Sequence, residues 1–395
     1  MNFIQPDNLK GIFMNHQLDK SLWGGDDVFD QLLSDIRARR QEIETLKHIP
    51  LDLIERFKEI GIYRAFVPKE FGGDEKTPTQ FLQAIEAISA ADGSCGWVAS
   101  FGMSPAYLAG LPMSSIEEVW GKSPDVVFAG GAFPPQEVKI VDGGYRVSGR
   151  WPWGSGCMGA SLIGVSIKIE GKGPLPQMAV MPVDQVFIDE ATWQVHGMAS
   201  SGSYDMVVDD VFVSNEWVFE RGGKLTLDSP FFRYPSLSIS AQVLSVTALG
   251  VAREAIDMVI AMSVGQKTVT GAPKIGDRHY AQIEIAKAEA KVQSSRAFFY
   301  QATEDAWQTV VDGGNPSREQ ASMLRLATTN LTRECAEATQ IAYRLAGMSS
   351  TYYDNHLSRC YRDVNMPTQH ALMGEITYQN AGSMMFGNDP FPGYI

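Results

Sequence analysis

The sequence is poor in cysteine, and its cysteines form no pair at the spacing of a metal or redox site. The four cysteines lie far apart, at Cys95, Cys157, Cys335 and Cys360, and no CxxC pair occurs. The first residues, MNFIQPDNLKG, are polar and lack the apolar run of a secretory leader. We therefore expect reduced thiols in a cytoplasmic protein.

The signatures of several common sites are absent as well. Six histidines occur, and none of them has the HxxxH or HExxH spacing of a zinc site. The chain has no GxSxG, no GxxxxGK[ST] and no GxGxxG after a strand-like run. We therefore expect no metal site, no serine-hydrolase elbow, no P-loop and no Rossmann site for a nicotinamide cofactor.

Basic residues are outnumbered, and long apolar runs are missing. The 33 lysines and arginines face 46 aspartates and glutamates, which gives a formal net charge of −13. This balance argues against nucleic acid or a membrane surface as partner, because both select basic patches. The stretch between Arg233 and Arg253 carries no charge, but its Ser, Thr and Gln residues are costly in hydrocarbon. We expect a buried helix there rather than a membrane span.

The residue pattern divides the chain into three parts. At 395 residues, two or three packed units are expected. Residues 1–123 have helical periodicity, residues 124–222 contain short runs of Val, Ile, Phe and Trp between Gly and Pro, and residues 223–395 are helical again. This order predicts an α+β protein rather than the alternating strands and helices of a doubly wound sheet.

Local signals mark several elements within these parts. Helices are expected over 29–46, 51–60 and 78–91 near the N-terminus, and over about 237–266, 278–312, 317–346 and 356–385 in an antiparallel C-terminal bundle. Thr77 before Pro78 is typical of an N-cap followed by proline at the first helical position. Asp92-Gly93-Ser94 is expected to form a break and an N-cap for a further helix through Trp97 and Phe101. Asp142-Gly143-Gly144 predicts a hairpin turn in the β part.

Two glycine-rich strand ends in the β part are candidates for the wall of a flat ring. One is Gly130-Gly131-Ala132-Phe133-Pro134-Pro135, and the other is Trp151-Pro152-Trp153-Gly154-Ser155-Gly156. Glycine lets the backbone approach a ring, indoles can cover its face, and Ser155 can bond to its heteroatoms. The alternative, which spacing alone favours, is that Trp151 and Trp153 belong to the core and Gly154 to a bulge.

Two polar segments are further candidates, and each also has a structural interpretation. Ser201 to Ser203 could contact a phosphate or a ring, although a solvated turn is the more common arrangement. Pro367 should start or kink a helix that carries His370 one turn later. Histidine titrates near neutral pH and can donate to an oxyanion, whereas a lone helical histidine more often has a structural role.

Four segments in this order resemble the acyl-CoA dehydrogenase superfamily. They are Phe66–Gly73 (FVPKEFGG), His196–Val213, Ala248–Ala255 (ALGVAREA) and Tyr361-Arg362-Asp363. The resemblance covers about residues 30–390. It implies an N-terminal helical domain, a central small β-barrel domain and a C-terminal four-helix bundle. It also implies a homotetramer or dimer of dimers, in which Leu345–Tyr352 of one chain reaches the cofactor of a neighbour.

Departures from the dehydrogenase pattern point to a different branch of the superfamily. The YEGT motif with the catalytic Glu is missing, and Ala371 stands eight residues after Asp363. The segments around Phe133 and Ser155 also differ from the usual flavin motifs. They resemble the oxygenase components of two-component flavin monooxygenases, such as the 4-hydroxyphenylacetate, steroid-ring, dibenzothiophene and indole or indoleacetate oxygenases.

That resemblance implies roles for individual residues. Ser155 and His370 would be catalytic, and Trp97, Ser104 and His370 would contact substrate. The residues that would bind the flavin are Phe133, Trp151, Trp153, Ser155, Gly156, Ser203 and Gly347. Reduced FAD or FMN would come from a separate NAD(P)H-flavin reductase and form a C4a-hydroperoxide with O2, which would oxygenate a small aromatic or heteroaromatic substrate.

The substrate and two competing functions stay open. Many members of this branch have a second active-site histidine after a D-x-S-x-G-W motif, but here no histidine occurs between Trp97 and His196. This favours an indole-like substrate that needs no phenolate, with a phenol still possible. The alternatives are an FAD-dependent acyl-CoA dehydrogenase and a non-catalytic flavin- or ligand-binding relative.

Overall fold

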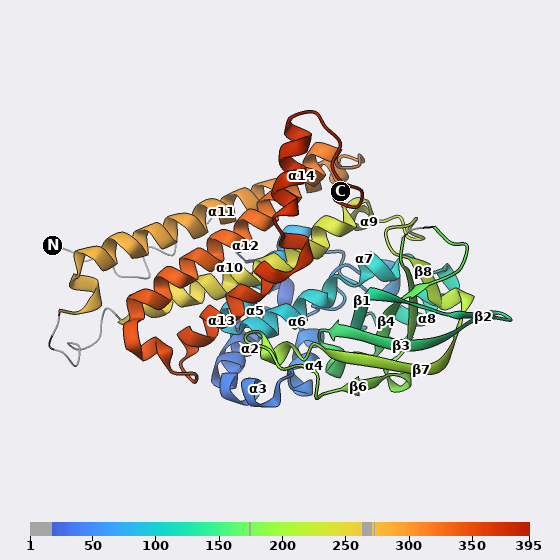
Figure 1. Ribbon diagram of the computed structural model, residues 1–395, viewed down its shortest axis with the longest axis horizontal. Coiled ribbons are helices and arrows are strands. Elements are labelled where there is room, and N and C mark those ends of the chain that lie inside the picture. The colour runs from blue at the N-terminus through green and yellow to red at the C-terminus, as the bar shows by residue number, and fades with distance from the viewer. Residues whose placement is uncertain (1–17, 174, 263–270, 272) are drawn as a thin grey trace.

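The computed structural model describes residues 18–173, 175–262, 271 and 273–395. The polar segment MNFIQPDNLKG and the end of the helix expected over 237–266 lie outside the described residues, so those expectations stay predictions. Figure 1 shows N-terminal helices, a β domain on one side and long C-terminal helices across the top. Within the described ranges, no helix is long and apolar enough to cross a membrane.

The N-terminal part is helical, as expected. Its helices are α2 Asp26–Ala38, α3 Arg40–Leu46, α4 Leu51–Glu59, α5 Pro78–Ala91, α6 Gly93–Ala99, α7 Pro105–Leu108 and α8 Met113–Trp120. The prediction of one helix over 29–46 was wrong, because the chain changes direction at Arg39, whose side chain binds Glu42 and Asp52. Thr77 forms the predicted N-cap, within a capping box with Gln80.

The β domain contains eight strands in two sheets. The strands are β1 Phe128–Glu137, β2 Lys139–Val141, β3 Gly144–Gly154, β4 Leu162–Lys168, β5 Gln177–Pro182, β6 Phe187–Asp189, β7 Tyr204–Ser214 and β8 Val218–Glu220. Their orders are β1-β4-β5-β8 and β2-β3-β7-β6. The predicted hairpin at Asp142 connects β2 to β3. The described strands therefore form two packed sheets in place of one closed barrel.

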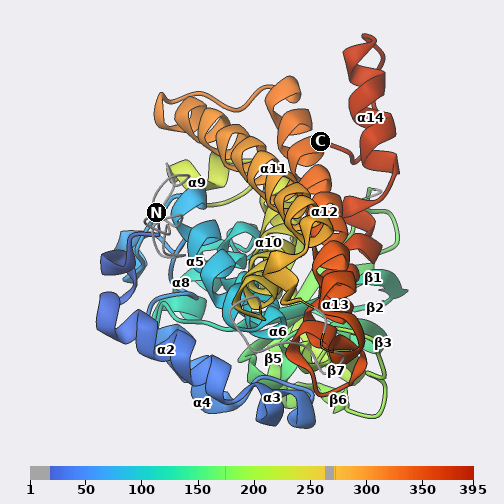
Figure 2. The same ribbon diagram turned by 90° about the vertical axis from the view of Figure 1, so that its left-hand side faces the viewer.

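Long helices form the C-terminal bundle. They are α9 Pro230–Arg233, α10 Ser236–Met262, α11 His279–Val311, α12 Arg318–Ala346, α13 His356–Gln369 and α14 Ile376–Met385. The segment expected as one helix over 356–385 is divided at His370. Figure 2 shows α10 at the centre, where it packs against α5, α12 and α13. The charge-free stretch before Arg253 is this buried helix, as predicted, and its polar side chains bond to neighbouring backbone, as Ser245 does to the Thr328 carbonyl.

Candidate active site

Three serine hydroxyls form a buried chain where the β domain meets the N-terminal helices. Gly154 at the end of β3 pairs with Tyr204 at the start of β7, so Ser155 and Ser203 are neighbours. Their Oγ atoms lie 2.6 Å apart, and Ser203 Oγ lies 2.8 Å from Ser201 Oγ. Trp97 on α6 donates its indole N–H to Ser155 Oγ at 3.1 Å. This contact could not be predicted from the sequence, because Trp97 and Ser155 are far apart along the chain.

Counting protons shows which of these three serine hydroxyls can donate a hydrogen bond to a ligand. Three hydroxyls carry three protons, and the two bonds between them use two. The remaining proton belongs to Ser155, Ser203 or Ser201, depending on the directions of the two bonds. Ser155 already accepts from Trp97, and it keeps 7% of its surface exposed, compared with 1% for Ser201. Ser155 is therefore the hydroxyl of the three that is most accessible to a bound molecule.

The two tryptophans of β3 have different environments. Trp151 is fully buried and donates its indole N–H to the Ser166 carbonyl on β4, so it belongs to the core between the sheets. The expected contact of Trp151 with a flavin stays a prediction. Trp153 is 63% exposed, because its φ of +65° and a register shift before Gly154 turn it out of the alternating pattern. Phe133 on β1 is also exposed.

His370 ends helix α13 instead of following a new helix start. The expectation that Pro367 starts a helix was wrong, because Pro367 lies in the last turn of α13, and the His370 amide donates to its carbonyl at 3.1 Å. The His370 side chain caps the next turn, since Nδ1 accepts from the Leu372 amide at 3.2 Å. Its ring lies 6.4 Å from the Trp97 ring in an edge orientation. Trp97 therefore brings His370 and Ser155 into one site.

The charge state of His370 follows from its surroundings. Burial lowers the pKa of His370 to about 4, helped by the positive charges of Arg221 and Arg325. The ring is therefore neutral at pH 7. Because Nδ1 accepts a backbone hydrogen bond, the single ring proton sits on Nε2. His370 thus presents one N–H donor, and no described residue accepts from it.

The remaining predicted residues lie at different distances from this centre. Gly156 has a φ of +73° and donates its amide to the Ser201 carbonyl at 3.0 Å, which ties the two serine segments together. Ser104 is buried at the start of α7. Gly347 ends α12, at the opposite end of α13 from His370. A helix of 14 residues spans about 20 Å, so Gly347 is not part of the same-chain site.

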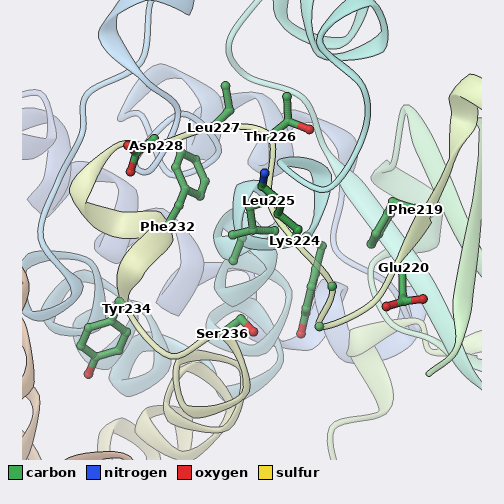
Figure 3. Close-up of a pocket in the computed structure, with 14 residues that line it drawn as sticks. Phe219, Glu220, Lys224, Leu225, Thr226, Leu227, Asp228, Phe232, Tyr234 and Ser236 are labelled. Atoms are coloured by element: carbon green, nitrogen blue, oxygen red, sulfur yellow. The ribbon is translucent and has the colours of Figure 1, made fainter. Parts of the chain in front are cut away.

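A cavity that sequence reasoning missed lies beside α7. It has a volume of about 530 Å³, which suits a small organic molecule. Its wall includes Tyr107, residues 222–228, Phe232 and Tyr234 (Figure 3). The guanidinium of Arg221 lies 5.3 Å from the centre of the Tyr107 ring. The only sequence signal here was Gly222-Gly223, which indicates no more than a turn.

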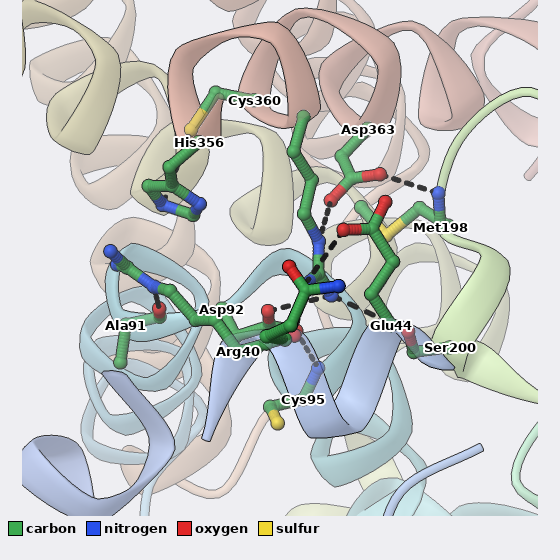
Figure 4. A network of polar contacts seen from close by, with 12 residues as sticks. Arg40, Glu44, Ala91, Asp92, Cys95, Met198, Ser200, His356, Cys360 and Asp363 are labelled. Atoms are coloured by element: carbon green, nitrogen blue, oxygen red, sulfur yellow. Dashed lines mark hydrogen bonds and ion pairs between the residues drawn. The ribbon is translucent and has the colours of Figure 1, made fainter. Parts of the chain in front are cut away.

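A buried ionic network holds the elements of the site together (Figure 4). Arg359 on α13 binds Asp92 at 2.7 Å, and Asp92 caps α6 through the Cys95 amide, within the segment 92–94 where the sequence predicts an N-cap. Asp363 accepts from the Met198 amide at 2.6 Å. Burial raises the pKa of Asp363 to about 6, although the charge of Arg359 opposes this shift.

The chain is similar to known proteins over most of its length. The acyl-CoA dehydrogenase N-terminal and C-terminal domain models match residues 27–111 and 242–375. Indole-3-acetate monooxygenase of Pseudomonas putida is 51% identical over 93% of this chain and 95% of its own length. The flavin-dependent monooxygenase oxygenase subunit HsaA of Rhodococcus jostii (strain RHA1) is 28% identical over 91% and 97%.

Similarity to solved structures extends over nearly the whole chain. The crystal structure of 3-HSA hydroxylase from Rhodococcus sp. RHA1 has a TM-score of 0.86 and 27% identity, covering 93% of this chain and 98% of that one. Fold, sequence relatives and the absence of the dehydrogenase glutamate motif agree. The chain therefore belongs to the flavin-dependent monooxygenases of the acyl-CoA dehydrogenase superfamily, as an oxygenase that uses reduced flavin.

Proposed function

We propose that this oxygenase acts in the cytoplasm, takes reduced FAD or FMN from a separate NAD(P)H-flavin reductase and oxygenates indole-3-acetate or a closely similar arylacetate. The observation that carries the proposal is the contact of Trp97 with both Ser155 and His370, which places two hydrogen-bond donors around one space. The substrate class is supported by the name of the Pseudomonas putida relative, which shares half of its residues with this chain.

The residues present fit a flavin. The ring edge of a flavin carries nitrogen and carbonyl acceptors, and Ser155, the most accessible of the three hydroxyls, can donate to it when Ser203 donates to Ser155. The exposed side chains of Phe133 and Trp153 are available to cover the ring. When bound, the reduced flavin supplies the electrons that activate O2.

His370 and its neighbours would act on oxygen and substrate. The neutral ring donates from Nε2 to an oxygen on which negative charge develops. Burial of Trp97 and Ser155 keeps water away from this space. The charges that act on His370 within the described part of the chain are those of Arg221 and Arg325, and both are positive. An arylacetate, which carries a negative charge, suits this field better than a cation does.

The proposal also includes a homotetramer. Large apolar side chains are exposed at both ends of the bundle. Met348 and Tyr352 lie at the turn between α12 and α13, and Met385 and Phe386 lie at the end of α14. An exposed apolar surface of this kind is typical of a contact with another chain. Such packing would also bring the Gly347 turn to a neighbouring site.

The experiment combines the purified protein with a flavin reductase, NADH and either FAD or FMN under labelled O2. Indole-3-acetate, indole and 4-hydroxyphenylacetate are offered in parallel, and products are identified by mass spectrometry. We expect a colourless protein and an indole-3-acetate product that contains one labelled oxygen atom. A yellow protein that reduces its flavin with an acyl-CoA and forms no oxygenated product would contradict the proposal.

A further inference from the structure

The loop that carries Ser201 and Ser203 rests directly on helix α13. Asp363 Oδ1 accepts from the Met198 amide at 2.6 Å. The loop backbone is so close to the helix that a Cβ atom on Gly197 would lie 2.2 Å from the Arg362 carbonyl oxygen. At Gly197 the contact is therefore between backbones, with no side chain there to absorb a displacement.

The same loop has a conformation that depends on this anchor. Met198 has a φ of +51°, which a non-glycine residue adopts only at a cost, so the surrounding contacts must hold it. The Ser201 amide donates to the Met198 carbonyl at 2.9 Å, and the Ser201 carbonyl accepts from Gly156. Ser203 then reaches Ser155. A continuous path of hydrogen bonds thus runs from Asp363 to the hydroxyl proposed to meet the flavin.

Helix α13 also carries the other half of the proposed site. His370 follows Asp363 by seven residues, which corresponds to a rise of about 10 Å along a helix. Arg325 on α12 fixes the turn beyond His370, because Nη2 donates to the Leu372 carbonyl at 2.9 Å. The two halves of the site are therefore attached to one rigid element.

We infer that Asp363 is a positioning residue, which holds the 197–203 loop on α13 and so fixes the serine chain relative to His370. This inference rests on the proposed function. The inference goes beyond the proposed function, because it states that α13 sets the distance between the flavin edge and His370. Asp363 itself touches neither flavin nor substrate in this assignment.

A purely structural role for Asp363 is the competing explanation. Its carboxylate also lies 3.5 Å from Arg359, inside the buried ionic network. Removing the carboxylate would therefore disturb both the charges and the loop. A variant that lifts the loop without changing any charge separates the two explanations, and Gly197→Ala does so, because its new methyl group meets the Arg362 carbonyl.

The experiment measures flavin affinity, product formed per NADH, H2O2 release and thermal midpoint. Gly382→Ala on α14 is the matched control, since a Cβ there meets nothing within 4 Å. We expect Gly197→Ala to weaken reduced-flavin binding about five- to tenfold, the effect of losing one aligned hydrogen bond, and to raise H2O2 release. Asp363→Asn keeps an oxygen acceptor for Met198 and should bind flavin more tightly than Asp363→Leu.

A double variant provides the decisive readout. If the loop acts through the serine chain, Gly197→Ala should cost little further affinity once Ser203→Ala is present. Additive losses, or a Gly197→Ala protein that melts early but binds flavin and couples like the wild type, would overturn the inference. A wild-type protein that neither binds reduced flavin nor oxygenates any substrate would instead overturn the proposed function, on which the inference rests.

Discussion

At the scale of single residues, Ser155 gives the most direct test of the site. Ser155→Ala removes the hydroxyl at the open end of the serine chain and leaves Trp97 without its acceptor. We expect reduced-flavin binding to weaken by about 1 kcal/mol, or more because the buried indole N–H loses its partner. Anaerobic flavin titration and product per NADH measure the change. Ser161→Ala, in the same β domain, is the control, and equal values for both variants would assign Ser155 a structural role.

His370 has two roles that can be separated: Nδ1 caps the turn after α13, and the Nε2–H can donate a hydrogen bond. His370→Asn keeps an oxygen that can accept from the Leu372 amide but removes the Nε2–H donor. We expect a near-normal thermal midpoint, less product per NADH and more H2O2. Loss of such a donor costs about 10² in rate, on the order of 2.7 kcal/mol. His370→Ala should add a loss of stability. If His370→Asn still oxygenates with full coupling, the catalytic role is withdrawn.

The lowered pKa of His370 predicts how stability depends on pH. The folded protein holds His370 neutral down to about pH 4, whereas the unfolded chain binds a proton near pH 6.5. The unfolded state therefore binds more protons between these values, and stability falls as the pH is lowered through this window. We expect His370→Asn to have a shallower decline than the wild type, measured by thermal unfolding from pH 7 to pH 4. Parallel declines would contradict the assigned pKa.

At the scale of elements, two arginines of α12 hold the turn that follows α13. Arg325 donates to the Leu372 carbonyl at 2.9 Å, and Arg333 donates to the Met373 carbonyl at 3.2 Å. Of these two arginines, only Arg325 contributes to the lowered pKa of His370, alongside burial and Arg221. We expect Arg325→Met to raise that pKa toward its ordinary value and Arg333→Met to leave it unchanged, as followed by an NMR titration of the imidazole protons. The same titration midpoint in both variants would contradict this expectation.

Elements with local signals could be predicted from the sequence, and those that depend on distant contacts could not. Thr77 and Pro78 set the start of α5 by neighbouring hydrogen bonds, so the sequence suffices there. Arg39 lies between α2 and α3 and binds the distant Asp52, a contact that no periodicity reveals. Trp153 turns outward through a register shift, so alternation alone misplaces it.

The candidate site, too, could be predicted from the sequence only in part. The motifs around Ser155 and His370 could be identified along the chain, but the link between them could not. That link is Trp97, which reaches Ser155 across 58 positions of sequence. The cavity at Tyr107 was also invisible, because its wall joins α7 to residues that follow β8. Both features arise only when the three parts of the chain pack together.

At the scale of the whole molecule, the homotetramer is open to direct measurement. Light scattering at micromolar concentration should give about four times the chain mass of 43.4 kDa. A charged substitution at an exposed apolar position, Tyr352→Asp, should shift the mass toward smaller species, because burying a carboxylate in an interface is costly. Tyr280→Asp, on the exposed face of α11, tests whether the effect is local. A wild-type monomer would contradict the prediction.

The buried ionic network has a consequence for the order in which the chain is made. Glu44 and Asp92 leave the ribosome long before their partners Arg362 and Arg359, with about 270 residues between Asp92 and Arg359. At 5–20 residues per second, that separation is roughly 15 to 50 s of synthesis. Until α13 emerges, burying Asp92 would leave a carboxylate without its arginine, which is strongly unfavourable. We therefore expect the N-terminal helices to pack loosely until α13 has been made, and a chain truncated before α13 to be digested faster by proteases than the full chain.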